Sequence, residues 1–395
     1  MKALIAGGGI GGVTAALSLL DAGIDVELYE RTSVFGEVGA GIQISPNGVK
    51  VLERLGLKSA LDALAFRPEA LEMRHGKSGA RIFSIPMREE AIRRFGAPYY
   101  HVHRADLMSI LSKALRTRAP NAVHMDKDVQ GYTQSARSVT FTFTDGSRAQ
   151  GDVAIGADGI HSAVRTQMLG AMPARFTGNV AWRVVVPAAS LPPNLVPPTA
   201  CVWVGPGRHA VTYYLRRGEL VNFVGVVERE GWQNESWTEL GHKADLAADF
   251  QGFAKPITSI IEQAANCYRW ALFDREPLEE WCRGRVTLLG DACHPMLPFL
   301  AQGAVMSIED AWVLARHLKG AADVPAALKA YEAARKPRTS RAQHGARRQM
   351  GLYHKRGLAA QLATYGPMWL AARLTPAIVH TRNDWLYGVD VTAGG

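Results

Sequence analysis

The chain has 395 residues, which allows two or three compact units at about 150 residues per domain. Its 47% hydrophobic and 21% charged residues are ordinary for a globular protein and suffice for a large buried core. The net charge of +9 is mostly scattered and is not interleaved with aromatic residues, which argues against a nucleic-acid-binding protein. No apolar run reaches about 18 residues, so we expect no membrane span.

One denser group of basic residues lies near the C-terminus. We interpret it as a solvated helix face, although an enzyme that handles anionic cofactors and acids would fit equally well. Its members are Lys336, Arg338, Arg341, Arg347 and Arg348.

The four cysteines are widely spaced. They form no C-x-x-C pair and no Cys/His cluster, so we expect no metal site, no structural disulfide and a cytoplasmic protein. They are Cys201, Cys267, Cys282 and Cys293.

The first 30 residues predict a βαβ unit. A short apolar strand over 3–6 precedes a helix from about 11 to 22, which Gly23 ends, and a second strand over 25–29. Glycines between positions 7 and 12 interrupt the apolar stretch, so we do not interpret it as a signal peptide.

The rest of the chain changes character twice. Helices and strands alternate first, then strands dominate from about 175 to 275, and helices dominate after a last buried strand. The mixed part has predicted elements at 47–55, 71–73, 81–85, 104–115, 139–143 and 152–155. The β-rich part has strands at 180–186, 201–204, 210–215 and 220–227. The final part has a strand at 286–289 and helices at 307–318 and 325–333.

This order predicts an α/β protein. One nucleotide-binding domain is assembled from separated segments, and a second domain, an antiparallel sheet, is inserted into it.

The N-terminal turn carries a G-x-G-x-x-G motif between strand and helix. Gly7 permits the tight turn, Gly9 lets the backbone approach a pyrophosphate, and Gly12 allows the helix to pack on the strand. The helix N-terminus offers free N–H groups to the phosphates. Glu30, at the end of the second strand, can accept hydrogen bonds from ribose hydroxyls. This motif alone does not distinguish NAD from FAD.

A second motif, DVAIGADGIHSAVR, covers residues 152–165. A buried strand ends at Gly156, and Asp158 and Arg165 follow in the loop. A purely structural interpretation is that Asp158 caps a helix and that Arg165 pairs with it.

A third motif, RVTLLGDACHPM, covers residues 285–296. Its strand delivers Asp291 to the end of the sheet where ligands bind, and a helix starts near Gly303 with its N-terminus able to stabilise negative charge.

The three motifs together resemble the fingerprints of the single-component FAD-dependent aromatic hydroxylases, which have the para-hydroxybenzoate hydroxylase fold. Gly39-Ala40-Gly41-Ile42 and His103-Arg104-Ala105-Asp106 also match. Within that family the chain looks most like salicylate hydroxylase, 3-hydroxybenzoate 6-hydroxylase and 6-hydroxynicotinate 3-monooxygenase. The resemblance implies a Rossmann-like FAD-binding domain with C-terminal helices over 1–70, 98–172 and 276–395, and a β-sheet substrate domain over 71–97 and 173–275.

The resemblance also implies cofactor contacts. Glu30 would hold the adenosine ribose, Val129 would lie near the adenine, Arg104 would contact the pyrophosphate and ribityl region, and Asp291 would bind the ribityl chain. Asp158 and Arg165 would serve FAD and the docking of NAD(P)H. The full expected set is Gly7, Gly9, Gly11, Gly12, Glu30, Arg31, Gly41, Arg104, Val129, Asp158, Arg165, Asp291, Pro295, Gly303 and Ala304.

The implied reaction uses non-covalently bound FAD, NADH or NADPH as a transient reductant, and O2. Reduced flavin and O2 give a C4a-hydroperoxide, which attacks an aromatic ring that a deprotonated hydroxyl makes electron-rich. His209 is the expected base for that hydroxyl, and Tyr213 shares its face because side chains alternate along a strand. The structural alternatives are a histidine that satisfies a buried hydrogen bond and an aromatic packing residue.

Two departures from the family concern the substrate pocket. Pro298 and Phe299 stand where relatives often carry His or Gln, and Gln43 stands where the hydroxynicotinate enzymes have His. The expected substrate-binding residues are therefore Gln43, His209, Tyr213, Pro298 and Phe299, and Arg183 and Arg208 are candidates for a substrate carboxylate.

We therefore predict a monooxygenase for a small hydroxylated aromatic acid, with a homodimer left open. A flavin-dependent epoxidase or tailoring oxygenase for a larger aromatic natural product is the alternative enzyme. A non-catalytic flavoprotein is the alternative from another class.

Overall fold

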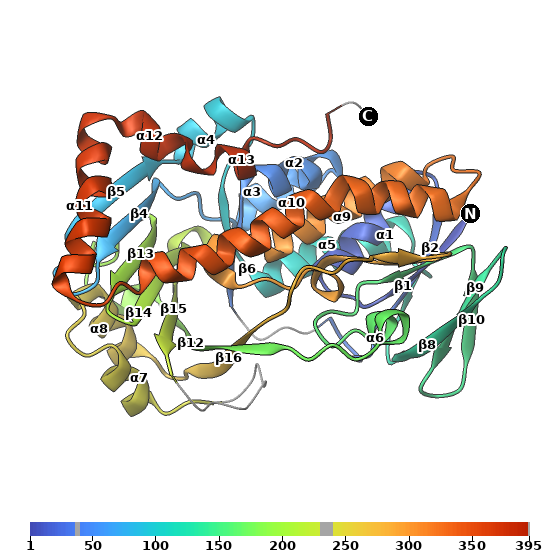
Figure 1. Cartoon of the computed structure of the whole chain (residues 1–395), viewed down its shortest axis with the longest axis horizontal. Coiled ribbons are helices and arrows are strands. Elements are labelled where there is room, and N and C mark those ends of the chain that lie inside the picture. Colours follow the sequence, from blue (N-terminus) through green and yellow to red (C-terminus); the bar gives the residue numbers. More distant parts are fainter. Residues whose placement is uncertain (36–39, 230–239, 394–395) are drawn as a thin grey trace.

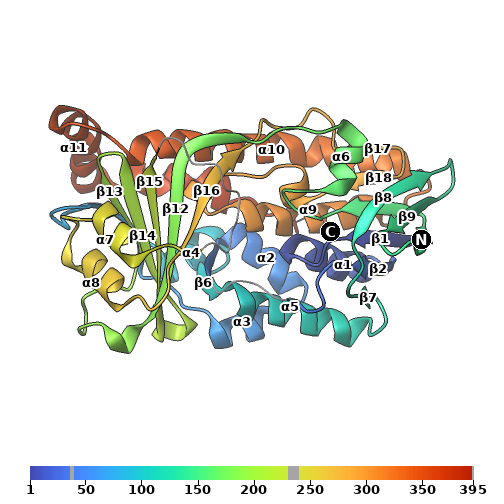
Figure 2. The ribbon, with the colours of Figure 1, turned by 90° about the horizontal axis from the view of Figure 1, so that it is seen from below.

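The protein is described by a computed structural model that covers residues 1–35, 40–229 and 240–393. It confirms the mixed α/β class: a six-stranded sheet and a seven-stranded sheet lie at opposite ends of the molecule, and the long helix α10 (Val324–Tyr353) runs along both (Figures 1 and 2). No helix within the described ranges has both the length and the apolar character needed to cross a membrane.

The six-stranded sheet is parallel except for its edge strand β17. β1 pairs with β2 on one side and with β11 on the other, and β11 pairs with β18. Because parallel neighbours end at the same edge, the three motifs that follow β1, β11 and β18 meet there. The strands in spatial order are β17 (Cys282–Arg283), β18 (Val286–Leu288), β11 (Val153–Gly156), β1 (Lys2–Ala6), β2 (Asp25–Tyr29) and β7 (Val123–His124).

Buried apolar side chains fill the central strands β1, β11 and β18, as expected for a parallel sheet that is covered on both faces. α1 (Ile10–Asp21) is buried along most of its length and packs against α9 (Gly303–Leu318) and α5 (Arg104–Arg118). This packing fixes where α1 and α9 begin, and both N-termini face the edge at which the motifs meet.

The seven-stranded sheet contains the strands of the β-rich part together with β4 and β5, which come from earlier in the chain. Its strands in spatial order are β16 (Tyr268–Asp274), β12 (Arg175–Pro187), β15 (Leu220–Glu228), β14 (Arg208–Leu215), β13 (Ala200–Gly205), β4 (Ala70–His75) and β5 (Arg81–Pro86). The expected antiparallel pairing holds for five of its neighbouring pairs, but it is wrong for β4 and β13, which are parallel. A hairpin forces antiparallel pairing, whereas β4 and β13 are joined by a long connection that permits the parallel arrangement.

The remaining strands form two small sheets. A three-stranded sheet contains β8 (Val129–Gln134), β9 (Val139–Phe143) and β10 (Arg148–Gly151). β3 (Gly41–Ile44) pairs with β6 (Tyr100–His103) between the two large sheets. The expected division of the chain into two domains stays a prediction.

The helices surround both sheets. α10 extends far beyond the expected segment and continues through Pro337, whose ring lies on the exposed side of the helix. The other helices are α2 (Pro46–Arg54), α3 (Lys58–Leu64), α4 (Arg88–Phe95), α6 (Ala163–Leu169), α7 (Lys243–Asp249), α8 (Lys255–Gln263), α11 (Leu358–Leu374), α12 (Pro376–His380) and α13 (Asp384–Tyr387).

Candidate active site

One cavity of about 790 Å³ joins the two large sheets. At one end it is lined by Gly9 and Gly11 of the N-terminal turn, and at the other by His209 and Tyr213 of β14. The loop after β18 and the start of α9 form the wall between them. A ligand that lies along this cavity can therefore contact the sheet edge and the inserted domain at once.

Four N-terminal glycines differ in the space around them. Gly7 has φ +101°, and a Cβ on it would lie 2.4 Å from the carbonyl oxygen of Ala157. A Cβ on Gly12 would lie 2.0 Å from the carbonyl oxygen of Gly7. The helix can therefore lie this close to the turn only if residue 12 is glycine. Gly11 is likewise closed, by Leu289 and Ser307, whereas a Cβ on Gly9 would meet nothing within 4 Å. Open space therefore lies in front of Gly9 alone.

Glu30 supports this turn from the end of β2. Its carboxylate accepts hydrogen bonds from the N–H of Gly8 (2.7 Å) and the N–H of Thr32 (3.0 Å). Oε1 also accepts from the hydroxyl of Thr32 (2.9 Å), whereas Oε2 accepts only from Gly8, so acceptor capacity for a ribose remains on Oε2.

The expected cofactor residues that do not line the large cavity are Gly7, Gly12, Glu30, Arg31, Val129, Asp158, Arg165 and Pro295. Arg31 is exposed, and Val129 is buried at the start of β8, opposite Phe143. Gly39, from one of the matching stretches, falls outside the described residues.

The second motif is anchored to the third. Arg165 donates to the carbonyl oxygens of Ala292 (3.0 Å) and Ile160 (2.6 Å). The structural interpretation of Asp158 is half right. Its carboxylate accepts from the N–H of Val164 (3.2 Å) in the first turn of α6. The residue that caps the helix is Ser162, however, and Arg165 is bonded to carbonyl groups. The other Asp158 oxygen, Oδ1, is buried without a hydrogen-bond partner, and burial raises the pKa of this carboxyl group.

The third motif forms the wall of the cavity. Asp291 lines it, and the surrounding protein raises the pKa of its carboxyl group, with His294 and Arg104 opposing that shift. Gly303 and Ala304, the first residues of α9, line it as well, and no side chain caps this helix. Their N–H groups and the helix dipole favour negative charge at this point. Pro295 is buried behind the wall, where its carbonyl accepts from Gln343 (3.0 Å).

The alternation expected along β14 is confirmed: His209, Val211 and Tyr213 all line the cavity. Tyr213 lies against Gly41, where an added Cβ would be 2.5 Å from the tyrosine ring. Gly41 also donates its N–H to Asn222 of β15 (2.9 Å). β3 is thus held against the substrate end of the cavity, and Gln43 of the same strand accepts from the hydroxyl of Tyr99 (2.7 Å).

Apolar side chains surround His209. The ring of Phe299 lies 5.4 Å from the His209 ring, and Tyr353 of α10 lies 4.9 Å from it on another side. Burial and the neighbouring His354 lower the pKa of His209 well below its ordinary value, so this imidazole is neutral and can accept a proton. Pro298 lines the same region.

The two arginine candidates for a carboxylate are placed differently. Arg183 of β12 lines the cavity, with its guanidinium 4.4 Å from the ring of Trp270. Arg208 points to the other face of β14, where it donates to the Asp249 carbonyl and lines a separate pocket. Two further arginines line the cavity near the C-terminal helices, Arg348 and Arg382, and no sequence motif connects them with the site.

The solvated-face interpretation of the basic group is wrong for Arg338 and Arg347. Arg338 forms two 2.8 Å bonds with the buried Glu309, and Arg347 pairs with Asp274 (2.5 Å). Only Arg341 and Arg348 of the group are exposed. The reason is that α10 packs across α9 and the β16 end, which bring carboxylates to its basic face.

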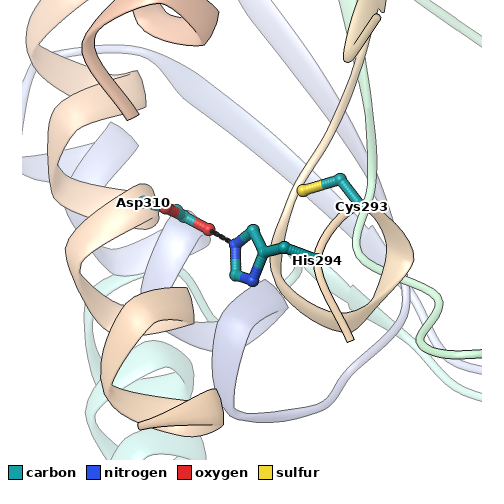
Figure 3. A group of neighbouring side chains, drawn as sticks. All are labelled: Cys293, His294 and Asp310. Atoms are coloured by element: carbon teal, nitrogen blue, oxygen red, sulfur yellow. Dashed lines mark hydrogen bonds and ion pairs between the residues drawn. The ribbon is translucent and has the colours of Figure 1, made fainter. Parts of the chain in front are cut away.

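A buried ion network stabilises the third motif from behind. Arg335 of α10 pairs with Glu309 and Asp310 of α9, both at 2.7 Å. Asp310 binds the His294 ring and accepts from the N–H of Gly290 (3.3 Å), so α9 holds the turn that carries Asp291 (Figure 3). Burial opposes ionisation of Glu309 and Asp310, but the partners outweigh it and hold both pKa values below the ordinary range.

Cys293, His294 and Asp310 also place three possible metal-ligand atoms within 4.8 Å of one another. Figure 3 shows the imidazole directed at Asp310, with the thiol beside it. A metal ion here would need the Cys293 thiolate, yet burial raises the pKa of that thiol well above its ordinary value, and the cationic Arg335 already binds Asp310. The arrangement suits an ion network better than a metal centre.

His354 belongs to the site although no sequence motif points to it. Its Nε2 lies 2.7 Å from Nδ1 of His209, and it stands at the end of α10, far from any motif. Only the packing of α10 on the inserted sheet brings the two imidazoles together.

Comparisons with known proteins agree with this geometry. The FAD binding domain family model matches residues 1–346. A 3-amino-4-hydroxybenzoate 2-monooxygenase of Streptomyces platensis is 38% identical over 393 residues, which are 99% of this chain and 96% of that protein. A 6-hydroxynicotinate 3-monooxygenase of Bordetella bronchiseptica is 34% identical over 98% of this chain and 95% of the relative. The structure of Klebsiella pneumoniae HpxO with FAD and uric acid matches with a TM-score of 0.84 and 32% identity, over 96% of this chain and 95% of that one.

Proposed function

Because the chain belongs to the FAD-binding-domain family and is an FAD-dependent aromatic monooxygenase, we propose that its substrate is a small hydroxylated aromatic acid. The reductant is NADH or NADPH, and O2 is the co-substrate. The observation that carries this proposal is the single cavity in which the start of α9, Asp291 and His209 come together.

The residues present fit FAD. Open space lies in front of Gly9, where a pyrophosphate needs close backbone approach, while Gly7 and Gly12 are closed by packing. The orphan Oδ1 of Asp158 lies in the loop beside this turn, and the uncapped N-terminus of α9 suits the electron-rich edge of a flavin. FAD bound here supplies hydride acceptance from the nicotinamide and activation of O2.

The remaining cofactor contacts are proposed as the family resemblance implies. Glu30, Arg31 and Val129 contact the adenosine end of FAD. Arg104 and Asp291 contact the pyrophosphate and ribityl part in its middle. Arg165 maintains the loop that carries Asp158. Gly41, Pro295, Gly303 and Ala304 surround the flavin end.

His209 is the proposed catalytic base at the substrate end of the cavity. We assign it the removal of the proton from a ring hydroxyl, which raises the electron density at the ortho and para carbons. Phe299 and Pro298 keep water away from that hydroxyl, and Tyr213 and Gln43 orient the ring. Arg183 is the proposed partner of the substrate carboxylate, since its guanidinium lines the cavity and a carboxylate needs a cation when it leaves water.

The alternative substrate is a larger aromatic natural product. The relatives that match at 34 to 38% identity over nearly the whole chain are named for hydroxylated benzoates and nicotinates, which favours the small acid. We also propose a cytoplasmic location, because all four cysteines are buried and free, while a homodimer remains compatible with the fold.

A substrate screen tests the proposal. The purified protein should be yellow and release unmodified FAD on denaturation. NADH and NADPH oxidation is then measured with a panel of hydroxylated benzoates and pyridine carboxylates, including 3-amino-4-hydroxybenzoate, and products are identified by mass. At least one acid should stimulate oxidation and gain one oxygen atom. A protein that binds no FAD, or that oxidises the nicotinamide equally with and without every acid, would contradict the proposal.

His209→Ala provides the matched test of the base. FAD content should stay at the wild-type level, while hydroxylation falls by about a hundredfold or more. Wild-type activity in this variant would remove His209 from its assigned role.

A further inference from the structure

Three side chains connect the substrate end of the cavity with the protein surface. Nδ1 of His209 lies 2.7 Å from Nε2 of His354, and Nδ1 of His354 lies 3.0 Å from Oε1 of Glu228. The exposed fraction rises along this series, from 1% for His209 to 33% for the Glu228 side chain. Glu228 also lines a separate pocket with Arg208 and Arg356.

We propose that His209, His354 and Glu228 form a proton relay that carries the substrate's hydroxyl proton from the cavity to solvent. The relay rests on the proposed function, in which His209 accepts that proton. It assigns roles to His354 and Glu228, neither of which touches the cavity or belongs to a motif.

The surroundings of His209 explain why it needs a relay. Its ring is packed against Phe299 and Tyr353, and a charged imidazolium among such groups is costly. Burial and His354 already lower the pKa of His209 well below its ordinary value. His209 can therefore receive the proton, but the protonated ring is unstable in these surroundings. A second acceptor that takes the proton from His209 makes deprotonation of the substrate hydroxyl favourable.

The hydrogen-bond pattern allows the transfer without an unpaired group. In the starting state His209 carries its proton on Nδ1 and donates to His354, which carries its proton on Nδ1 and donates to Glu228. The hydroxyl proton forms a bond to Nε2 of His209. The Nδ1 proton of His209 then moves to Nε2 of His354, and the Nδ1 proton of His354 moves to Glu228 and onward to water.

The reverse transfer restores the starting state. Both imidazoles end the first transfer as the opposite neutral tautomers, and the substrate oxygen is left negative. When the product oxygen regains a proton, the same three bonds are crossed in the opposite direction. Protons and charge therefore balance over the turnover, and no further reactant is required.

Charged groups at the outer end tune the relay. Burial raises the pKa of Glu228, but the hydrogen bond from Arg356 and the neighbouring His354 outweigh it and leave this pKa below its ordinary value. Burial lowers the pKa of His354, which Glu228 opposes. Arg229 and Asp249, bonded to each other at 2.6 Å, line the outer pocket with Arg208. Glu228 is thus ionised at neutral pH and ready to accept.

Proton release provides the test. The holoenzyme is mixed in weak buffer with 3-amino-4-hydroxybenzoate as the probe, and a pH indicator follows the rate of release. The variants are His354→Gln and Glu228→Gln, which keep a hydrogen-bonding side chain but cannot pass the proton on. We expect the probe Kd to stay within about twofold and the release rate to fall by about tenfold or more, with a larger solvent isotope effect.

Two further variants serve as controls. Glu228→Asp keeps the carboxylate and should recover most of the rate. His75→Gln changes another histidine of the same sheet, which is bonded to Ser78 (3.1 Å) and Gln361 (3.3 Å), and should behave as the wild type. If His354→Gln does not fold, Glu228→Gln decides, since its side chain is one-third exposed.

Release at the wild-type rate in both Gln variants would overturn the relay. So would equal losses in His75→Gln, or a wild-type holoenzyme that oxidises NADH in response to the probe without releasing a proton. Failure of the proposed function is distinguishable, because the wild type would then show no acid-stimulated NADH oxidation with any member of the panel.

Discussion

Arg165 donates a hydrogen bond to the carbonyl oxygen of Ala292 at 3.0 Å, and so joins the loop after β11 to the loop after β18. The two loops are far apart in sequence and become neighbours because their strands are adjacent and parallel. Arg165 is buried, and burial lowers its pKa, with Arg275 acting in the same direction. Its position therefore depends on the carbonyl groups that surround it.

Replacement of Arg165 should weaken FAD binding. Arg165→Gln removes charged hydrogen bonds worth about 1.5–3 kcal/mol each, and the loops that carry Asp158 and Asp291 lose their fixed spacing. We expect the Kd for FAD to rise by about tenfold or more, measured by fluorescence titration of the apoprotein. Arg137→Gln, at an exposed position of the β8–β9 turn, is the control and should leave the Kd unchanged. Equal affinities would show that Arg165 does not organise the site.

The two glycines of the turn should fail in different ways when replaced by alanine. In Gly12→Ala the new Cβ lies 2.0 Å from the Gly7 carbonyl oxygen, so the turn cannot keep its shape and the apoprotein should lose stability. In Gly9→Ala the Cβ meets nothing, so the apoprotein should unfold at nearly the wild-type temperature but retain less FAD after gel filtration. Thermal unfolding and bound-flavin absorbance measure the two effects. A large loss of apoprotein stability in Gly9→Ala would contradict this separation.

The sequence was sufficient to predict the motif-bearing part of the fold. Glycines with strict spacing, short apolar strands and period-two alternation are local signals, so the βαβ unit and the shared face of His209 and Tyr213 could be predicted. The cofactor assignments required the family resemblance in addition, since a glycine-rich turn alone fits more than one dinucleotide.

Long-range partners could not be predicted in this way. His354, Glu309 and Arg338 acquire their surroundings only from the packing of α10, a helix whose local pattern resembles any basic surface helix. The parallel pairing of β4 with β13 has the same origin, because it joins segments with no local turn between them. A single sequence contains no signal for such contacts.

The buried ion network predicts a large effect on stability. Arg335→Leu would leave Glu309 and Asp310 buried with one cation fewer, and removal of one partner from a buried network costs about 3–5 kcal/mol. Urea unfolding of the apoprotein should show this loss. Arg341→Leu, a change of an exposed arginine on the same helix, should cost about 1 kcal/mol or less. Comparable losses in both variants would mean that the network contributes no more than a surface charge.

The pH dependence of stability should depend on His101. This histidine is fully buried beside Phe66, Tyr99 and Tyr213, and burial lowers its pKa to about 3. Its folded pKa lies below the ordinary value, so the unfolded chain binds the proton first as the pH falls. The contribution of neutral His101 to the free energy of unfolding is therefore complete above about pH 6.5 and is lost progressively toward pH 3.

His101→Phe removes that titration while keeping an aromatic ring. Between pH 7 and pH 5 the free energy of unfolding should fall by about 2 kcal/mol more in the wild type than in the variant. The size follows because one pKa unit corresponds to about 1.4 kcal/mol. Urea unfolding at the two pH values measures the difference, and the contributions of all other histidines cancel because both proteins contain them. Parallel losses in wild type and His101→Phe would show that His101 is already protonated in the folded protein at pH 5.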